Sequence, residues 1–396
     1  MQKDKRVIRG GVVLALLLAG PAAAAEAWDG TIPPWQYFPG NLELDVGALA
    51  GGAIFGASGH GGQKATGAAK LMPRLHRDFD SGLSLGLDAV LAAADPLSHG
   101  RYGGDGLEKA YGEVRTGLGR LEIGKTDGAA YDLAVTGPEV DDQVSLDNPQ
   151  TTFFRDPKTG RALTDIFALR TQVGASSNFA KFTYVSPNLF GAQLALSFTP
   201  NQSRVVPPFV HEGPHVPDRQ ADIWEGAIKY EDELGPVSFS AYGGVAAGRG
   251  EHKPAGQEGV SDYGFGLRAD YPINDDFALS LGGAWRQSNA YAFQIAKSFN
   301  AATTRTEQAS AGLTYGAWSL GLEYGDGNAG QVPGSPHLAL TGYQAGLGYS
   351  FSTSITISTG WQRLNYARDS GAFYNGSPRV RLDAAFLHLT VKTSNS

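Results

Sequence analysis

The chain has 396 residues, no cysteine and a formal net charge of −7. The lack of thiols excludes cysteine catalysis and cysteine–zinc sites, and the negative charge is the wrong sign for a nucleic-acid-binding protein. Glycine, at 54 residues, is about twice as frequent as in average proteins. No apolar run after residue 20 is long enough for a membrane helix.

The first 27 residues predict a secretory signal peptide. A basic segment with Lys3, Lys5, Arg6 and Arg9 precedes a short apolar run, and Ala25-Glu26-Ala27 has the form of a cleavage site. We expect cleavage after Ala27 or Ala25; the alternative, a buried apolar helix, does not suit the basic flank. Removal of residues 1–27 changes the formal charge to −9 and leaves 28–396, which we expect to form a single domain without linkers.

From Asn41 onward, apolar and polar residues alternate with the period of a β-strand. In "AWSLGLEYGDG", for example, Trp318, Leu320 and Leu322 share one face, and Ser319 and Glu323 share the other. We predict sixteen such strands, at about 41–57, 71–79, 82–95, 107–117, 119–127, 178–186, 191–200, 221–231, 236–248, 261–271, 276–288, 304–316, 318–326, 338–350, 353–367 and 379–392.

Short turns and long Gly/Pro-rich loops alternate between these predicted strands. The pattern sorts the short turns to one end of the sheet and the long loops to the other, as in a transmembrane antiparallel β-barrel with an even strand number. A soluble β-sandwich has no reason to sort its loops in this way. So many strands enclose more space than side chains can fill, so the polar face is expected to line water.

Two stretches resemble the Gram-negative trimeric porins. These are "EKAYGEVRTGLGRLEIGKTDGAAYD", Glu108 to Asp132, and "FAKFTYVSPNLFGAQLALSFTP", Phe179 to Pro200. The resemblance implies a sixteen-stranded outer-membrane barrel that forms a homotrimer, with short periplasmic turns and long extracellular loops. It also implies a third loop that folds into the lumen, with basic residues on the wall opposite. Such a protein passes ions and small hydrophilic solutes by passive diffusion, without catalysis or a cofactor.

Mapped onto this chain, the third loop is about 128–177. Residues 127–167 carry eight acidic and three basic residues, a net charge of −5. We predict that the loop faces the pore; the alternative is a charged loop in the outer solvent. The predicted acidic constriction residues are Asp127, Asp132, Glu139, Asp141, Asp142 and Asp147.

Strand parity suggests the basic side of the constriction. The predicted residues are Arg74, Lys109 and Arg115. The alternative is that some basic residues are rim charges near a turn, an objection that applies most to Arg115 and Arg120. Since acidic residues are in excess, we expect a weak cation preference.

Aromatic residues are distributed unevenly along the chain. Residues 41–126 contain four, whereas 179–396 contain 29. Lipid-facing strands of outer-membrane barrels carry aromatic girdles. The first five strands are therefore expected to face protein in a closed oligomer, unless the girdle is thin there by chance.

Other functional patterns are weak. "HEGPH", His211 to His215, matches a zinc-peptidase motif, but that motif requires a helix, and Gly213 and Pro214 disfavour one. The rival functions that remain are a channel selective for a sugar or another small polar solute, a barrel enzyme and an adhesin.

Overall fold

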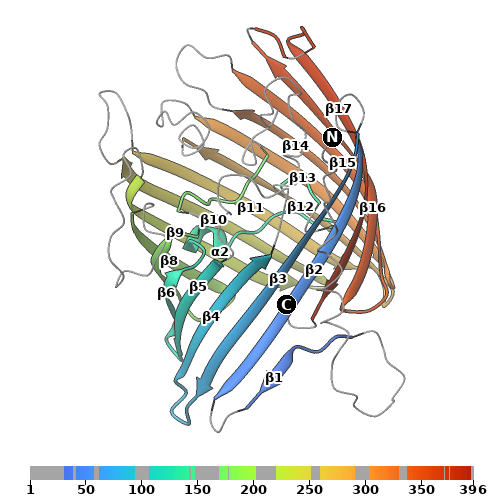
Figure 1. Ribbon diagram of the computed structural model, residues 1–396. Helices are drawn as coiled ribbons and strands as arrows, with labels where there is room; N and C mark the ends of the chain where they lie inside the picture. Colours follow the sequence, from blue (N-terminus) through green and yellow to red (C-terminus); the bar gives the residue numbers. More distant parts are fainter. Residues whose placement is uncertain are drawn as a thin grey trace, which may run out of the picture.

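The computed structural model describes residues 31–38, 42–57, 62–93, 107–141, 144–147, 169–176, 178–201, 220–250, 259–289, 303–329, 337–369, 371–373 and 375–393. In these ranges, sixteen strands pair antiparallel in chain order, and the last pairs with the first to close a barrel (Figure 1). None of the described helices is long and apolar enough to cross a membrane. The barrel strands are β2 (Glu43–Ala57), β3 (Gly62–Asp78), β4 (Ser84–Ala93), β5 (Leu107–Thr116), β6 (Gly119–Lys125), β7 (Ala180–Val185), β8 (Ala192–Asn201), β9 (Gln220–Leu234), β10 (Val237–Gly250), β11 (Val260–Pro272), β12 (Phe277–Ser288), β13 (Thr304–Tyr315), β14 (Trp318–Ala329), β15 (Leu338–Ser350), β16 (Ile355–Arg368) and β17 (Arg379–Lys392).

The predicted sixteen-stranded barrel is confirmed, and most strand bounds agree within three residues. The largest error is in β3, which begins at Gly62, whereas the sequence predicted a loop over 58–70. Residues 62–70 lack apolar alternation, but their backbone pairs with β2 from Gly62 opposite Ala57 to Lys70 opposite Leu49. Backbone pairing with a neighbouring strand overrides weak local preference there.

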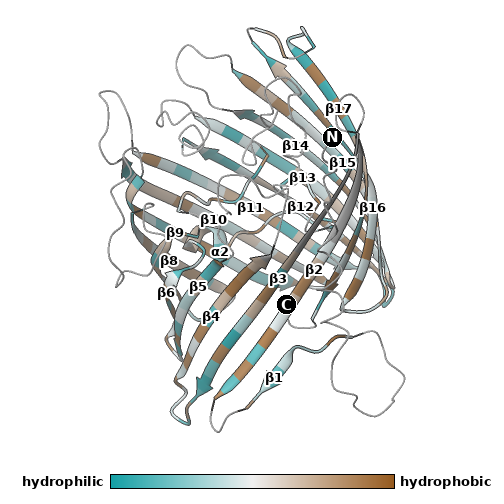
Figure 2. Cartoon of the chain, viewed as in Figure 1, coloured by the Kyte–Doolittle hydropathy of each residue, from teal (hydrophilic) through white to brown (hydrophobic). Residues whose placement is uncertain are grey.

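The two faces of the strands differ in chemistry as the alternation predicts. On β14, the outward side chains of Leu320 and Leu322 are 46% and 55% exposed, whereas the inward side chain of the next residue, Glu323, is 7% exposed. Figure 2 shows the resulting mixture of hydrophobic and hydrophilic residues along each strand. An apolar outer surface and a polar inner surface suit a barrel with lipid outside and water inside.

Both ends of the chain contribute to the barrel seam. A short strand that the sequence did not predict, β1 (Trp35–Tyr37), pairs antiparallel with β2 at Val46, Asp45 and Leu44. The last strand, β17, pairs with the same edge of β2 from Leu49 to Ala57. The two terminal segments thus share one edge and leave fewer unpaired backbone groups on it, which a barrel in lipid requires.

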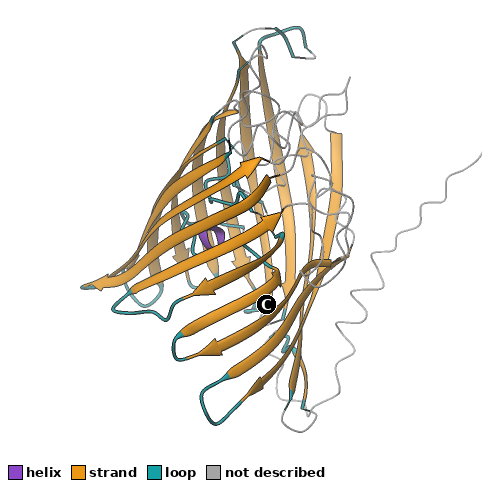
Figure 3. Cartoon of the chain, turned by 90° about the vertical axis from the view of Figure 1, so that its left-hand side faces the viewer, coloured by secondary structure: helices purple, strands orange, loops and turns teal. Residues whose placement is uncertain are grey.

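The largest buried apolar clusters among the described residues lie inside the barrel. After β6 the chain enters the lumen and forms a single helical turn, α2 (Ala129–Asp132), which Figure 3 shows within the ring of strands. The side chains of this turn and of the returning segment pack on inward residues of β7 to β11. Two clusters result: Ala130, Val173, Ala175, Ile223, Ala246 and Val260; and Ala129, Leu133, Val135, Val185, Ala195 and Tyr242.

Candidate functional site

The first turn of the loop that follows β6 is bonded to the inner wall. The backbone N–H of Ala129 donates to Ser197 Oγ on β8 at 3.0 Å, and that of Ala130 donates to Glu225 Oε2 on β9 at 3.3 Å. Backbone N–H groups in a loop have no ladder partners, so side chains of the wall must satisfy them. A Cβ atom at Gly128 would lie 1.8 Å from Glu225 Oε2, so this close approach requires glycine.

One lysine holds the two ends of the loop together. Lys181 on β7 is 1% exposed, and its Nζ donates to the carbonyl oxygen of Thr126 at 2.7 Å and to that of Ser176 at 3.4 Å. Thr126 precedes the loop and Ser176 ends it. The N–H of Ser176 also donates to Glu225 Oε1 at 2.8 Å, so Glu225 binds both arms.

Asp141 is buried against the inner side of β16 and β17 and does not line open lumen. Its Oδ2 contacts His388 Nδ1 on β17 at 2.6 Å and accepts a hydrogen bond from Ser358 Oγ on β16. Its Oδ1 accepts the N–H of Val144 at 3.1 Å. With both oxygens engaged and the side chain 5% exposed, Asp141 anchors the loop, which differs from the predicted role at the constriction.

Asp147, which the sequence placed at the constriction, is also buried, at 3% exposed. Its Oδ1 accepts the N–H of Thr171 at 3.0 Å, which joins the outgoing and returning arms of the loop. The backbone N–H of Leu146, the residue before Asp147, donates to Glu323 Oε2 on β14 at 3.0 Å. Glu139 is half-buried, and Asp142 lies outside the described residues.

Burial gives Asp147 an unusual titration. It raises the pKa of this carboxyl to about 6 from an ordinary value of 3.8, and the positive charge of Arg170 opposes the rise. A raised folded-state pKa means that the folded protein holds the proton more tightly, so stability is greatest at low pH and falls as the pH rises through about 6.

We therefore expect the wild-type protein to gain about 1 kcal/mol in its free energy of unfolding, relative to the Asp147→Asn variant, between about pH 7 and about pH 5. Urea unfolding of both proteins at the two pH values measures this difference. Parallel pH dependence in the two proteins would show that Asp147 does not titrate in this range.

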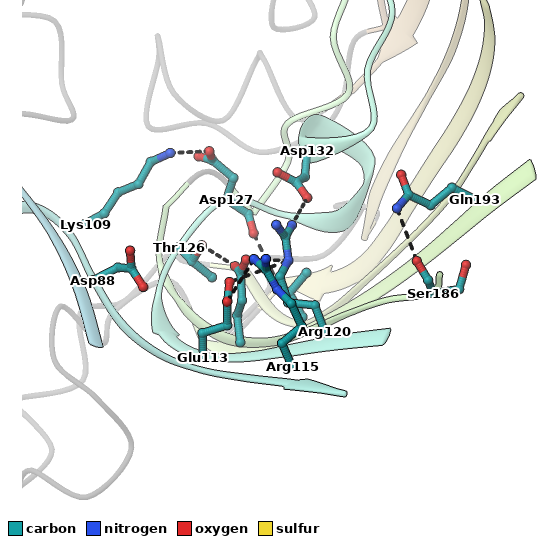
Figure 4. Close-up of polar contacts among 12 residues, drawn as sticks. Asp88, Lys109, Glu113, Arg115, Arg120, Thr126, Asp127, Asp132, Ser186 and Gln193 are labelled. Carbon is teal, nitrogen blue, oxygen red and sulfur yellow. Dashed lines mark hydrogen bonds and ion pairs between the residues drawn. The ribbon is translucent and has the colours of Figure 1, made fainter. Parts of the chain in front are cut away.

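The wall formed by β3 to β6 carries a cluster of paired charges, which we call the wall cluster. Figure 4 shows how side chains of β5 and β6 converge on the loop around α2. The cluster contains four basic and five acidic side chains, a net charge of −1 when all are ionised. Its members are Arg74, Lys109, Arg115, Arg120, Asp88, Glu113, Glu122, Asp127 and Asp132.

Glu113 is the centre of the wall cluster. Its side chain is 5% exposed, and its Oε1 lies 3.4 Å from Arg74 Nη2 and 2.9 Å from Arg115 Nη2. Arg74 also pairs with Asp88, at 3.2 Å between Nε and Oδ1. The predicted basic residues are therefore together on one wall, but acidic side chains of the same wall partly neutralise them.

Two further ion pairs join the loop to this wall. Arg120 Nη2 lies 2.7 Å from Asp132 Oδ2, and Lys109 Nζ pairs with Asp127 Oδ2. Asp127 and Asp132 thus lie directly beside basic residues, where the sequence had suggested opposite charges across a gap. Arg74, Arg115 and Asp132 keep side-chain exposures of 42%, 51% and 33%, so their charges remain accessible to solvent.

Sequence reasoning missed the residues that hold the loop. Lys181, Glu225, Glu323 and His388 all lie at inward positions of their strands, among otherwise small or uncharged neighbours. The alternation placed Glu323 on the polar face of its strand, but it carried no information about which inward side chains meet the loop backbone.

Comparisons with known proteins agree on one architecture. A family model described as Gram-negative porin matches residues 11–392. OmpF of Salmonella typhi, solved with daunomycin, superposes with a TM-score of 0.59 at 12% identity over 90% of this chain and 100% of that chain. In-vitro folded OmpT of Vibrio cholerae, in its trimer form, has a TM-score of 0.55 at 11% identity, over 89% of this chain and 100% of that chain. The anion-selective porin of Comamonas acidovorans has a TM-score of 0.52 at 12% identity, over 89% of this chain and 99% of that chain. A search of curated proteins found no match.

Proposed function

Because this chain belongs to the Gram-negative porin family, we propose that it passes ions and small hydrophilic solutes by passive diffusion, with a weak preference for cations. The family and the closed barrel make it an outer-membrane channel rather than an enzyme. We propose the ion selectivity of this channel and the position of its narrowest point from the loop and the wall cluster.

The observation that carries this proposal is the loop bonded along the inner wall beside solvent-accessible charges. The described parts of the loop take up lumen volume at α2 and at Ser176, and Arg74, Arg115 and Asp132 offer both signs of charge next to α2. Closely spaced opposite charges produce a local field that favours small polar solutes over apolar ones.

We place the constriction beside the wall cluster, where the loop's first turn meets β5 and β6. Asp127 and Asp132 supply its acidic charges, and Arg74, Lys109, Arg115 and Arg120 supply its basic charges. The net charge of −1 in this cluster supports a weak cation preference. The Comamonas porin is described as anion-selective, so the barrel fold alone does not fix the sign of the preference.

We further propose a homotrimer formed through the outer face of β3 to β5. Its exposed large side chains are aliphatic, whereas the outer face of β11 to β15 carries aromatic pairs such as Phe265 with Trp285. An aromatic-poor outer face suits protein contact better than a lipid interface. One aromatic pair, Trp35 and Tyr37 on β1, lies at the turn end of this face. The exposed leucines are Leu71, Leu85, Leu87 and Leu91.

The test is single-channel recording of the purified, folded protein in a planar bilayer under a KCl gradient. We expect ohmic openings in groups of three and a reversal potential of the sign produced by cation-preferring channels. A folded barrel without conductance would contradict the open pore, and openings of uniform single size would contradict the trimer.

A further inference from the structure

A cluster of metal-ligating side chains lies beside the wall cluster and shares no residue with it. Glu43 and Asp45 are two residues apart on β2, and His76 is directly opposite Glu43 on β3. His76 Nε2 lies 3.2 Å from Glu43 Oε2, and His76 Nδ1 lies 3.7 Å from Asp45 Oδ2. One ligand atom from each side chain falls within 4.8 Å of the other two.

The register places this cluster on the inner face, near the end of the barrel that carries the short turns. Asp45 is directly opposite Arg74, whose guanidinium belongs to the lumen-facing wall cluster, so Asp45 and its i−2 neighbour share that face. β2 begins at Glu43, and β3 enters a short turn after Asp78. In outer-membrane barrels the short turns are periplasmic, so the cluster faces the periplasmic mouth.

The two carboxylates are not neutralised by a nearby cation. In the described part of the chain, His76 is the single basic side chain that forms an ion-pair contact with Glu43 or Asp45. Arg74 is the obvious alternative partner, but it is turned toward Asp88 and Glu113. With a neutral imidazole, the cluster carries a charge of −2 and can take up a divalent cation.

An amide group from the unpredicted strand β1 covers the carboxylates. Gln36 Nε2 donates to Asp45 Oδ1 at 2.7 Å and to Glu43 Oε1 at 3.4 Å. Each carboxylate keeps its second oxygen on the side of His76. Hydrogen bonds of this kind from outside the ligand set orient carboxylate ligands toward a metal.

We propose that Glu43, Asp45 and His76 form a binding site for a divalent transition-metal ion, with Zn²⁺ as the best-suited ion. One imidazole and two carboxylates favour such metals over Ca²⁺ and Mg²⁺, which prefer ligand sets made of oxygen alone. Tetrahedral zinc with bonds of about 2.1 Å separates its ligand atoms by roughly 3.4 Å, close to the 3.2 Å between His76 and Glu43. The fourth position stays open to water from the lumen.

The test is calorimetric titration of the chelator-treated, folded protein with ZnCl₂. We expect one Zn²⁺ per chain, and we expect both His76→Ala and Asp45→Asn to weaken binding by more than the ~10–100-fold that loss of an outer-shell partner costs. The matched control is His337→Ala, which removes an exposed imidazole outside the cluster. Absence of binding to the wild-type protein, or binding that persists in His76→Ala, overturns the proposal.

A second measurement needs no variant. Diethyl pyrocarbonate modifies accessible imidazoles, and His76 is 20% exposed. We expect Zn²⁺ to protect His76 and to leave His337 reactive, as read by mass spectrometry of peptides. Equal modification of His76 with and without Zn²⁺ would overturn the site. Neither experiment depends on conductance, so this site and the proposed channel function can fail separately.

Discussion

Replacement of both Asp127 and Asp132 by asparagine is expected to turn the proposed weak cation preference of the channel into an anion preference. The two carboxylates pair with Lys109 and Arg120, and their neutralisation changes the charge of the wall cluster from −1 to +1. The interaction energy between a unit charge and a monovalent ion about 4 Å away in water is roughly 1 kcal/mol. Two such changes amount to about 2 kcal/mol for a permeating ion, or about thirtyfold before screening by salt reduces the effect.

The reversal potential under a KCl gradient measures this shift directly. The matched control is the Asp232→Asn and Asp276→Asn double variant, which makes the same change in charge at two exposed positions near the short turns, one at the end of β9 and one in the turn before β12. An unchanged reversal potential in the Asp127 and Asp132 variant, or an equal change in the control, would show that these carboxylates do not line the conducting path.

Replacement of Lys181 by methionine should release the base of the loop. The change keeps most of the side-chain volume but removes the donors to the carbonyl oxygens of Thr126 and Ser176. The carbonyl of Thr126 loses its lysine donor, and a buried carbonyl left without a partner costs roughly 1–3 kcal/mol. The carbonyl of Ser176 still accepts the N–H of Phe179 at 3.3 Å. The buried Glu225 nearby also loses a positive neighbour. We expect a lower free energy of unfolding and a larger, noisier single-channel conductance.

The control for this variant is Lys229→Met on β9. Lys229 pairs with Glu231 at 2.7 Å, is 26% exposed at its side chain and makes no described contact with the loop. It should leave conductance and stability close to those of the wild-type protein. A Lys181→Met channel with wild-type conductance would mean that the loop keeps its place without this clamp.

The barrel was predictable from sequence because strand alternation and loop length are local signals. β15 and β17 match their predicted bounds, since aromatic and aliphatic residues alternate along their full length. The predicted strand at 71–79 was shorter than β3 because residues 62–70 are small or polar and show no alternation. The sequence did not predict β1 because three residues are too few to show a pattern. Both are set by pairing with β2, a contact between strands that no local pattern encodes.

The candidate site was predictable in composition but not in geometry. The acidic character of the loop and the basic residues of the wall were visible in the sequence. The sequence did not show which carboxylates of the loop are buried. Asp141 and Asp147 are buried and anchor the loop, whereas Asp127 and Asp132 belong to the wall cluster. That division depends on which carboxylates meet backbone N–H groups and inward side chains. The contact of Asp141 with His388 alone spans 247 residues of chain.

The loop lies against the inner wall of the barrel, and a cysteine cross-link tests this placement most directly. Val140 of the loop packs over Gly321 of β14, where an added Cβ atom would lie 3.4 Å from Val140 Cβ. That spacing is close to the 3.5–4.5 Å found between the Cβ atoms of disulfides. The chain has no cysteine of its own, so an introduced pair has no competing thiol.

The measurement is the oxidation of the Val140→Cys and Gly321→Cys double variant, read as a reductant-sensitive change in gel mobility and by mass spectrometry. The control pairs Val140→Cys with Leu320→Cys, since Leu320 precedes Gly321 but faces outward. We predict an intramolecular disulfide in the first variant and none in the control, with wild-type conductance retained after oxidation. Failure of the first pair to cross-link in folded barrel would contradict the placement of the loop, and with it the proposed constriction.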